Sequence, residues 1–142
     1  MRSRAALVTL PAAACVALAI GTATTGAATQ TVVPRDCMHE AVKPHRIIVT
    51  CADANFFLSG LKWSHWGRKT AAGKGTANIN DCKPFCAQGH FHKYPVRVTL
   101  SSAHFCRNAG QTQFRRMRLT FTGTVPMGLK RTSSQRVACP LK

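Results

Sequence analysis

The densest group of side chains that could do chemistry lies between residues 82 and 92. Cys82, Cys86, His90 and His92 place four potential metal ligands within this segment, and zinc takes tetrahedral sets of two cysteines and two histidines. This spacing matches no common zinc finger, and a disulfide between the two cysteines would leave only a histidine pair. Reactive dithiol motifs separate their cysteines by two residues rather than three. The sequence therefore predicts a structural disulfide here, with no metal site and no cofactor.

The sequence contains few of the residue combinations that hydrolytic catalysis requires. A nucleophilic triad needs a Ser or Cys, a His and an acid, and the nucleophile motif Gly-x-Ser-x-Gly is absent from the sequence. Only four acidic residues could supply paired carboxylates for glycoside cleavage, and Asp53 with Asn55 is typical of a turn. A small nuclease that uses His65, His90 or His92 as acid and base remains the alternative. An enzyme is therefore the less favoured interpretation.

The charge balance is the main indication about partners. The chain has 20 Lys and Arg against four Asp and Glu, a formal net charge of +16. Two of the arginines lie in the first 28 residues, so 18 cations against four acids remain beyond them, a net charge of +14. A field of this sign attracts polyanions and weakens with added salt. Phosphate-rich cell-wall polymers, anionic lipid head groups, nucleic acid and acidic glycans all fit, and a basic surface that only keeps the protein soluble is the alternative.

The N-terminal segment has the features of a secretory signal peptide. A positively charged start precedes an uncharged apolar run over residues 5–20, and small residues follow as far as Ala28. The run is short and is interrupted by Pro11, which disfavours a membrane anchor. We therefore expect a signal peptide over residues 1–28, a secreted protein, and no membrane span after the signal is removed.

The cysteine count agrees with export. Removal of Cys15 with the signal leaves six cysteines, an even number that predicts three disulfides in an exported chain. Joining neighbours along the sequence predicts the bridges Cys37–Cys51, Cys82–Cys86 and Cys106–Cys139.

Beyond residue 45 the chain alternates between short β-strand patterns and turn signals. In the clearest pattern, Val96, Val98 and Leu100 alternate with Arg97 and Thr99, so that one face is buried and the other is wet. The expected strands are Arg46–Ala52, Phe57–Trp66, Gly73–Asp81, Tyr94–Ala103, Arg115–Thr122 and Arg136–Cys139.

These strands predict an all-β fold: a single antiparallel, sandwich-like domain or small barrel, stapled by three disulfides. We expect the domain to span residues 46–142, and Pro34 and Pro44 favour an extended lead-in over residues 29–45.

The same alternation points to surface residues that could contact an anionic polymer. Trp63 and Trp66 are three residues apart and would face opposite sides of a regular strand. Because Trp63 would share its side with Leu61, we expect Trp63 in the core and Trp66 exposed as a stacking platform. The candidate contacts are Lys62, Trp66, Arg68, Lys69, Lys74, Arg97, Arg116 and Arg118.

Most of residues 46–139 resembles a group of small secreted proteins of actinobacteria. The resemblance rests on a Cys-Ala-Asp-x-Asn segment, two tryptophans, a Cys-x-Pro-x-Cys-Ala element and a Tyr-Pro-Val strand. It implies export and a β-rich, disulfide-bonded fold, and it implies no activity. The matching positions are Cys51, Asp53, Asn55, Trp63, Trp66, Cys82, Pro84, Cys86 and Tyr94.

The sequence as a whole predicts a secreted basic protein that binds anionic polymers at or outside the cell surface without catalysis. The nuclease described above is one alternative. A secreted inhibitor or toxin that binds another protein is a second, because a disulfide-bonded scaffold would suit it.

Overall fold

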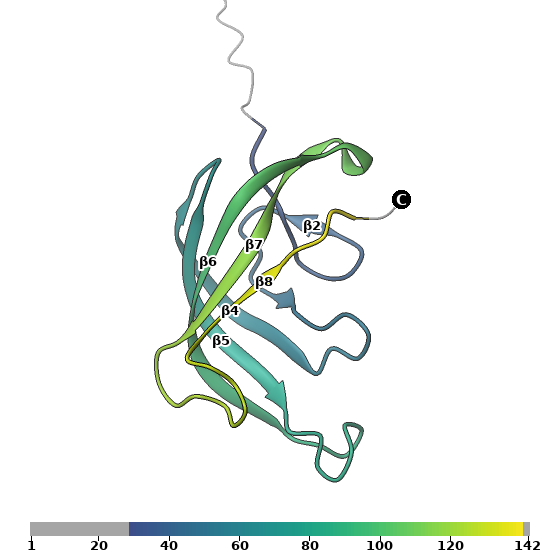
Figure 1. Ribbon diagram of the computed structural model, residues 1–142, viewed down its shortest axis with the longest axis vertical. Coiled ribbons are helices and arrows are strands. Elements are labelled where there is room, and N and C mark those ends of the chain that lie inside the picture. Colours follow the sequence, from purple (N-terminus) through teal and green to yellow (C-terminus); the bar gives the residue numbers. More distant parts are fainter. Residues whose placement is uncertain (1–28, 141–142) are drawn as a thin grey trace, which may run out of the picture.

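Six strands follow one another in the order of the sheet, each antiparallel to the one before it. The computed structural model describes residues 29–140, and Figure 1 shows that the sheet curls into a half-barrel whose two edges are β3 and β8. A second, two-stranded sheet pairs β1 (Val33–Pro34) with β2 (Glu40–Ala41). The six strands are β3 (Ile47–Ile48), β4 (Phe56–Trp66), β5 (Ala71–Asn80), β6 (Phe91–Cys106), β7 (Gln111–Phe121) and β8 (Thr132–Arg136). The expected all-β antiparallel fold is confirmed.

The inner face of the half-barrel carries the hydrophobic core. On β6 and β7 the predicted alternation is confirmed: Val98 lies opposite Leu119 and Leu100 opposite Met117, and each of these side chains is at most 2% exposed. Burying a side chain of this size stabilises the fold by about 1.5–3 kcal/mol. These pairs fix which side of the sheet faces solvent, because a shift of one residue would turn every side chain over.

Strand β5 carries small residues on its inner side, and this lets large side chains of β4 approach it closely. A Cβ atom added at Gly73 would lie 2.9 Å from the Trp63 ring, and one at Gly75 would lie 2.9 Å from Leu61. Glycine at these two positions therefore makes room for the core residues of the neighbouring strand.

Two irregularities in β4 overturn the expected orientation of the tryptophans. The register between β4 and β5 shifts between Ser59 and Lys62, where Gly60 has a φ of +59°, and shifts again between Trp63 and His65. Each shift inserts one extra residue into β4, as a β-bulge does.

Because of the second shift, Trp63 and Trp66 both face inward, and the prediction of an exposed Trp66 is wrong. The ring of Trp66 packs edge-on against Trp63 at 4.7 Å and against Phe114 at 5.5 Å. Its Nε1 donates a hydrogen bond to the carbonyl oxygen of Thr31 (3.0 Å), and Trp63 Nε1 donates one to the carbonyl oxygen of Pro44 (2.9 Å). Both indole N–H groups are thus satisfied inside the protein, as partly buried tryptophans require.

The six cysteines form the three disulfides that neighbour pairing predicted, with Cα–Cα distances of 5.5, 3.7 and 5.7 Å. Cys37–Cys51 ties the β1–β2 connection to the turn before β4, and Cys82–Cys86 closes a loop between β5 and β6. Cys106–Cys139 ties the end of β6 to the segment after β8. Each bridge therefore fixes a segment with few backbone pairings of its own.

Several expected boundaries differ from the structure: β5, β6 and β7 begin two, three and four residues earlier than expected, and three larger differences follow. Residues 29–45 are part of the folded domain rather than a lead-in, because they contain β1 and β2 and place Val33 in the core at 1% exposure. The first strand of the large sheet is only Ile47–Ile48, since the backbone N–H groups of Val49 and Thr50 both donate to the Phe56 carbonyl in a turn.

The last strand is Thr132–Arg136, and the expected strand Arg136–Cys139 is wrong. Strand β8 is an edge strand with one neighbour, and its residues are Thr, Ser, Ser, Gln and Arg. It therefore lacks the apolar alternation by which a sequence pattern is recognised.

The predicted signal peptide, residues 1–28, and Cys15 within it lie outside the described residues. Among residues 29–140 the structure contains no helix that is both long and apolar enough to cross a membrane.

Candidate polyanion-binding face

Three cations lie in one row on the outer face of the sheet, the side opposite the core. Lys62 on β4 lies directly opposite Lys74 on β5, and Lys74 lies directly opposite Arg97 on β6. All three side chains are exposed. Adjacent strands are about 4.8 Å apart, so the row brings three positive charges from three strands close together.

The row belongs to a larger cationic surface. Two residues further along β6 and β7, Thr99 lies opposite Arg118, which lies opposite Ser134 on β8. The next row places Ser101 opposite Arg116, which in turn lies opposite a second arginine on β8. We call the exposed cations on this side of β4–β8 the outer basic face: Lys62, Lys74, Lys93, Arg97, Arg116, Arg118 and Arg136.

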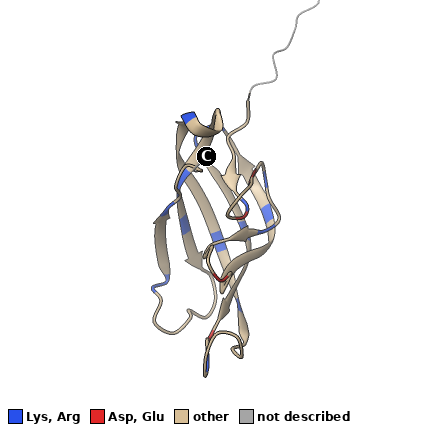
Figure 2. Cartoon of the chain, turned by 90° about the vertical axis from the view of Figure 1, so that its right-hand side faces the viewer, with Lys and Arg blue, Asp and Glu red and all other residues tan. Residues whose placement is uncertain are grey.

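Acidic residues do not neutralise this face. All four lie outside strands β3–β8, in β2 and in turns, and Figure 2 shows basic segments along the strands as well as in connections. Across residues 29–140, the ion pairs join Asp36 to Arg35 and His39, and Asp81 to His92. The charges of the outer basic face therefore repel one another, since like charges directly opposite across strands are destabilising.

Five of the eight candidate contacts expected from the sequence lie on the outer basic face. They are Lys62, Lys74, Arg97, Arg116 and Arg118. Arg68 and Lys69 lie instead in the turn between β4 and β5, beside Thr31 and Thr112 in a shallow hollow. Trp66 lies on the inner face, so it is no longer a candidate contact for an anionic polymer.

Two members of the outer basic face were missed. Lys93 keeps the alternation of Arg97 on β6, so the pattern of that strand could have identified it. Arg136 could not have been placed, because its partner Arg116 is known only from the pairing of β7 with β8.

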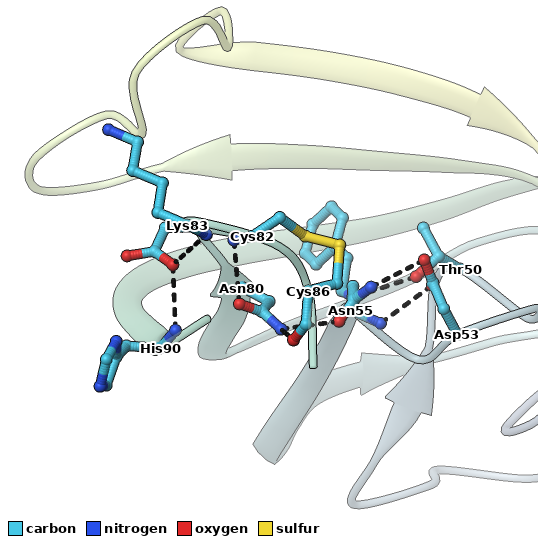
Figure 3. Close-up of a disulfide and its surroundings, with 10 residues drawn as sticks. Thr50, Asp53, Asn55, Asn80, Cys82, Lys83, Cys86 and His90 are labelled. Carbon is cyan, nitrogen blue, oxygen red and sulfur yellow. Dashed lines mark hydrogen bonds between the residues drawn. A yellow bond between two sulfur atoms is a disulfide. The ribbon is translucent and has the colours of Figure 1, made fainter. Parts of the chain in front are cut away.

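The residues of the Cys-x-Pro-x-Cys element and of the Asp53–Asn55 turn form one hydrogen-bonded network (Figure 3). Asn80 Nδ2 donates to Asn55 Oδ1 (2.8 Å) and to the Cys86 carbonyl (2.8 Å), and its Oδ1 accepts from the Cys82 N–H (3.0 Å). Asn55 donates in turn to both carboxylate oxygens of Asp53. These positions join two loops, so they have a structural role.

Next to this network, Asp81 accepts three hydrogen bonds. They come from His92 Nε2 (2.9 Å), the His90 N–H (3.0 Å) and the Lys83 N–H (3.2 Å). The bond from His92, followed by the two from the backbone, holds the pKa of Asp81 well below its usual range.

The three histidines named as possible acid and base do not all lie together, because His65 is far from His90 and His92. His65 lies opposite Ala72, whereas His92 lies opposite Ile79, and seven residues of strand separate these positions by about 24 Å. No cluster of three or more His, Cys, Asp or Glu side chains suited to a metal ion occurs between residues 29 and 140.

A groove of about 540 Å³ opens between the two edges of the half-barrel. Its lining is mainly aliphatic, with Val33, Ile47 and Met117 among its residues, and its charged residues are Asp36, Glu40 and Arg136. Two of the four Asp and Glu side chains thus line this groove beside one cation, so it suits a polyanion less well than the outer basic face does.

The fold and this surface define a small, disulfide-bonded antiparallel half-barrel with a cationic outer face. Searches among protein-family models, curated proteins and solved structures gave no match for the chain.

Proposed function

We propose that the protein is exported and binds anionic polymers at or outside the cell surface, without catalysis, through its outer basic face. The observation that carries the proposal is the row Lys62–Lys74–Arg97, in which each cation lies directly opposite the next. The three disulfides support export, because such bonds persist in oxidising compartments.

The arrangement of the charges favours binding over solubility alone. A soluble surface can intersperse cations with acids and neutral residues. Like charges opposite each other across strands instead cost roughly 0.2–1 kcal/mol per pair. A bound polyanion would remove this repulsion and would release its own counterions to the solution. The hydroxyl groups of Thr99 and Ser101 lie in the adjacent rows and could donate hydrogen bonds to anionic oxygens.

The test compares two variants with the same loss of charge. The face variant carries Arg97→Gln, Arg116→Gln and Arg118→Gln. The control variant replaces three exposed cations that lie outside the face: Lys43→Gln, Arg107→Gln and Lys130→Gln.

Binding to a single-stranded oligonucleotide, to inorganic polyphosphate and to anionic wall polymer is measured across a salt series. The logarithm of the affinity should fall linearly with the logarithm of salt concentration, and the face variant should lower the slope by about 2. The control variant should change the slope much less. If none of the polymers is retained at about 0.1 M salt, where screening already acts within about 10 Å, the proposal is wrong.

A further inference from the structure

Two phenylalanines meet on the outer face of the sheet, away from the core. Phe57 on β4 and Phe91 on β6 flank β5, and their ring centroids are 5.4 Å apart. Asn78 lies opposite Phe57 on the intervening strand and is only 4% exposed. Phe91 is 47% exposed, so one aromatic surface remains open to solvent.

An arginine extends this aromatic pair. The guanidinium carbon of Arg46 lies 4.2 Å from the centre of the Phe57 ring, a distance at which a cation is attracted to the ring face. Arg46, Phe57 and Phe91 thus form a platform of flat groups with an exposed ring at one end. None of the three was among the contacts expected from the sequence.

The platform is continuous with the outer basic face. Along β6 the outward positions are Phe91, Lys93, Pro95 and Arg97, and such positions follow one another every 6.8 Å or so. The row Lys62–Lys74–Arg97 therefore begins about 20 Å along the strand from Phe91. A flexible polymer that follows β6 would meet an aromatic ring first and cations after it.

We infer that the polymer is a single-stranded nucleic acid, with a base stacked on Phe91 and phosphates held by Lys93 and the Lys62–Lys74–Arg97 row. This inference rests on the proposed function. Single strands expose the π-faces of their bases together with a charged backbone, and proteins bind them with stacking platforms beside cations. Wall polymers of polyol phosphate and inorganic polyphosphate have no flat ring to place on Phe91, and a duplex hides the faces of its bases.

The experiment compares four probes at about 0.1 M salt. They are a thymidine oligonucleotide of about twelve nucleotides, within the usual site size, an abasic strand of the same length, its duplex with the complementary strand, and inorganic polyphosphate. We expect the oligonucleotide to bind about 5- to 100-fold more tightly than the abasic strand.

The matched variants are Phe91→Leu, Phe91→Trp and Phe85→Leu. Phe91→Leu keeps an apolar contact with Phe57 but has no flat ring, so it should lose most of the preference for the oligonucleotide and leave polyphosphate binding unchanged. Phe91→Trp should retain that preference. Phe85 is 54% exposed but lies in the Cys82–Cys86 loop, so Phe85→Leu should have no effect.

The outcomes separate this inference from the proposed function. If the abasic strand, the duplex or polyphosphate binds as tightly as the oligonucleotide, the polymer is not a single-stranded nucleic acid, and the polyanion proposal stands. If Phe91→Leu keeps the wild-type preference for the oligonucleotide, no base stacks on Phe91, and the inference is wrong while the polyanion proposal stands. If no probe binds but anionic wall polymer is retained, only the nucleic-acid inference is wrong. If wall polymer is not retained either, both are wrong.

Discussion

Lys74 and Arg97 lie directly opposite each other on β5 and β6, both exposed on the outer face, and Lys62 flanks Lys74 on the other side. Replacing Lys74 by Gln should remove two like-charge contacts and raise the free energy of unfolding at low salt by about 0.2–1 kcal/mol for each contact removed. The gain should disappear near 1 M salt, where screening acts within about 3 Å. Denaturant melts at both salt concentrations measure it.

The control for this prediction is Lys130→Gln, which removes one charge in the connection between β7 and β8. It should change the stability less than Lys74→Gln does. A decrease in stability for Lys74→Gln at low salt would show that the row is not under electrostatic repulsion.

Leu119 and Arg118 are neighbours on β7 but face opposite sides of the sheet. Leu119 is 2% exposed and packs opposite Val98, whereas Arg118 is exposed. Leu119→Ala should lower the free energy of unfolding by about 2–4 kcal/mol, and Arg118→Ala should change it by less than about 0.5 kcal/mol. Denaturant melts of the two variants test the register, because an error of one residue would exchange the two results.

The sequence pattern was sufficient for the regular strands. On β6 and β7 the apolar residues of the alternating pattern, such as Val98 and Leu119, are buried, and the arginines between them are exposed. It failed where the chain departs from a period of two. The shift between Trp63 and His65 turns Trp66 inward. Unlike the first shift, where Gly60 stands, it has no glycine in the sequence to indicate it.

The candidate site was predictable only in part for a related reason. Alternation indicates that Lys74 and Arg97 each point away from the core, but it cannot show that they lie opposite each other, since that depends on the pairing of β5 with β6. The same holds for Phe57 and Phe91, which are far apart in sequence and meet only across an intervening strand. Spacing within a strand is visible in a sequence, whereas register between strands is not.

Trp66 should matter for stability and not for direct contact with a polymer. Its ring packs on Trp63 and Phe114, and its Nε1 donates to Thr31. Trp66→Phe should therefore destabilise the fold, because it removes buried ring surface and leaves the Thr31 carbonyl oxygen without this donor. At temperatures where the variant is folded, its affinity for single-stranded oligonucleotide should equal that of the wild type. A loss of affinity in the fully folded variant would restore Trp66 as a contact.

Asp81 should make the stability of the protein sensitive to acid. Hydrogen bonds from His92 and from two backbone N–H groups depress its folded-state pKa, so its contribution to stability is present above the unfolded-state pKa of about 3.9. That contribution is lost as the pH falls toward the folded-state pKa. Asp81→Asn should therefore be less stable than the wild type near neutral pH, and the difference should shrink as the pH falls below about 4.

Equilibrium unfolding at a series of pH values measures this difference, and NMR titration of the Asp81 carboxyl measures the pKa itself. His92→Gln should raise the pKa of Asp81 toward its usual value, because the bond from His92 is the largest cause of the shift. A difference between wild type and Asp81→Asn that stays constant from neutral pH to pH 2 or so would contradict the prediction.

The Cys106–Cys139 disulfide should stabilise the fold more than Cys82–Cys86 does. It closes a loop with a sequence separation of 33, against 4 for the other. The chain-entropy model gives about 4 kcal/mol for the longer loop and about 2 kcal/mol for the shorter one. Cys106 is also 1% exposed, and the residues next to Cys139 are held by hydrogen bonds from Arg115 to Val137 and from Gln113 to Ala138.

Two double variants test the order, one with both residues of the longer bridge replaced by Ala and one with both residues of the shorter. Denaturant melts should show the larger loss of unfolding free energy for the Cys106→Ala/Cys139→Ala variant, with its segment after β8 becoming accessible to protease first. Peptide mapping of the unreduced wild type should recover the same three pairs that the structure contains. Equal losses in the two variants, or a larger loss for the short loop, would contradict the prediction. Loop length would then not determine how much each disulfide stabilises the fold.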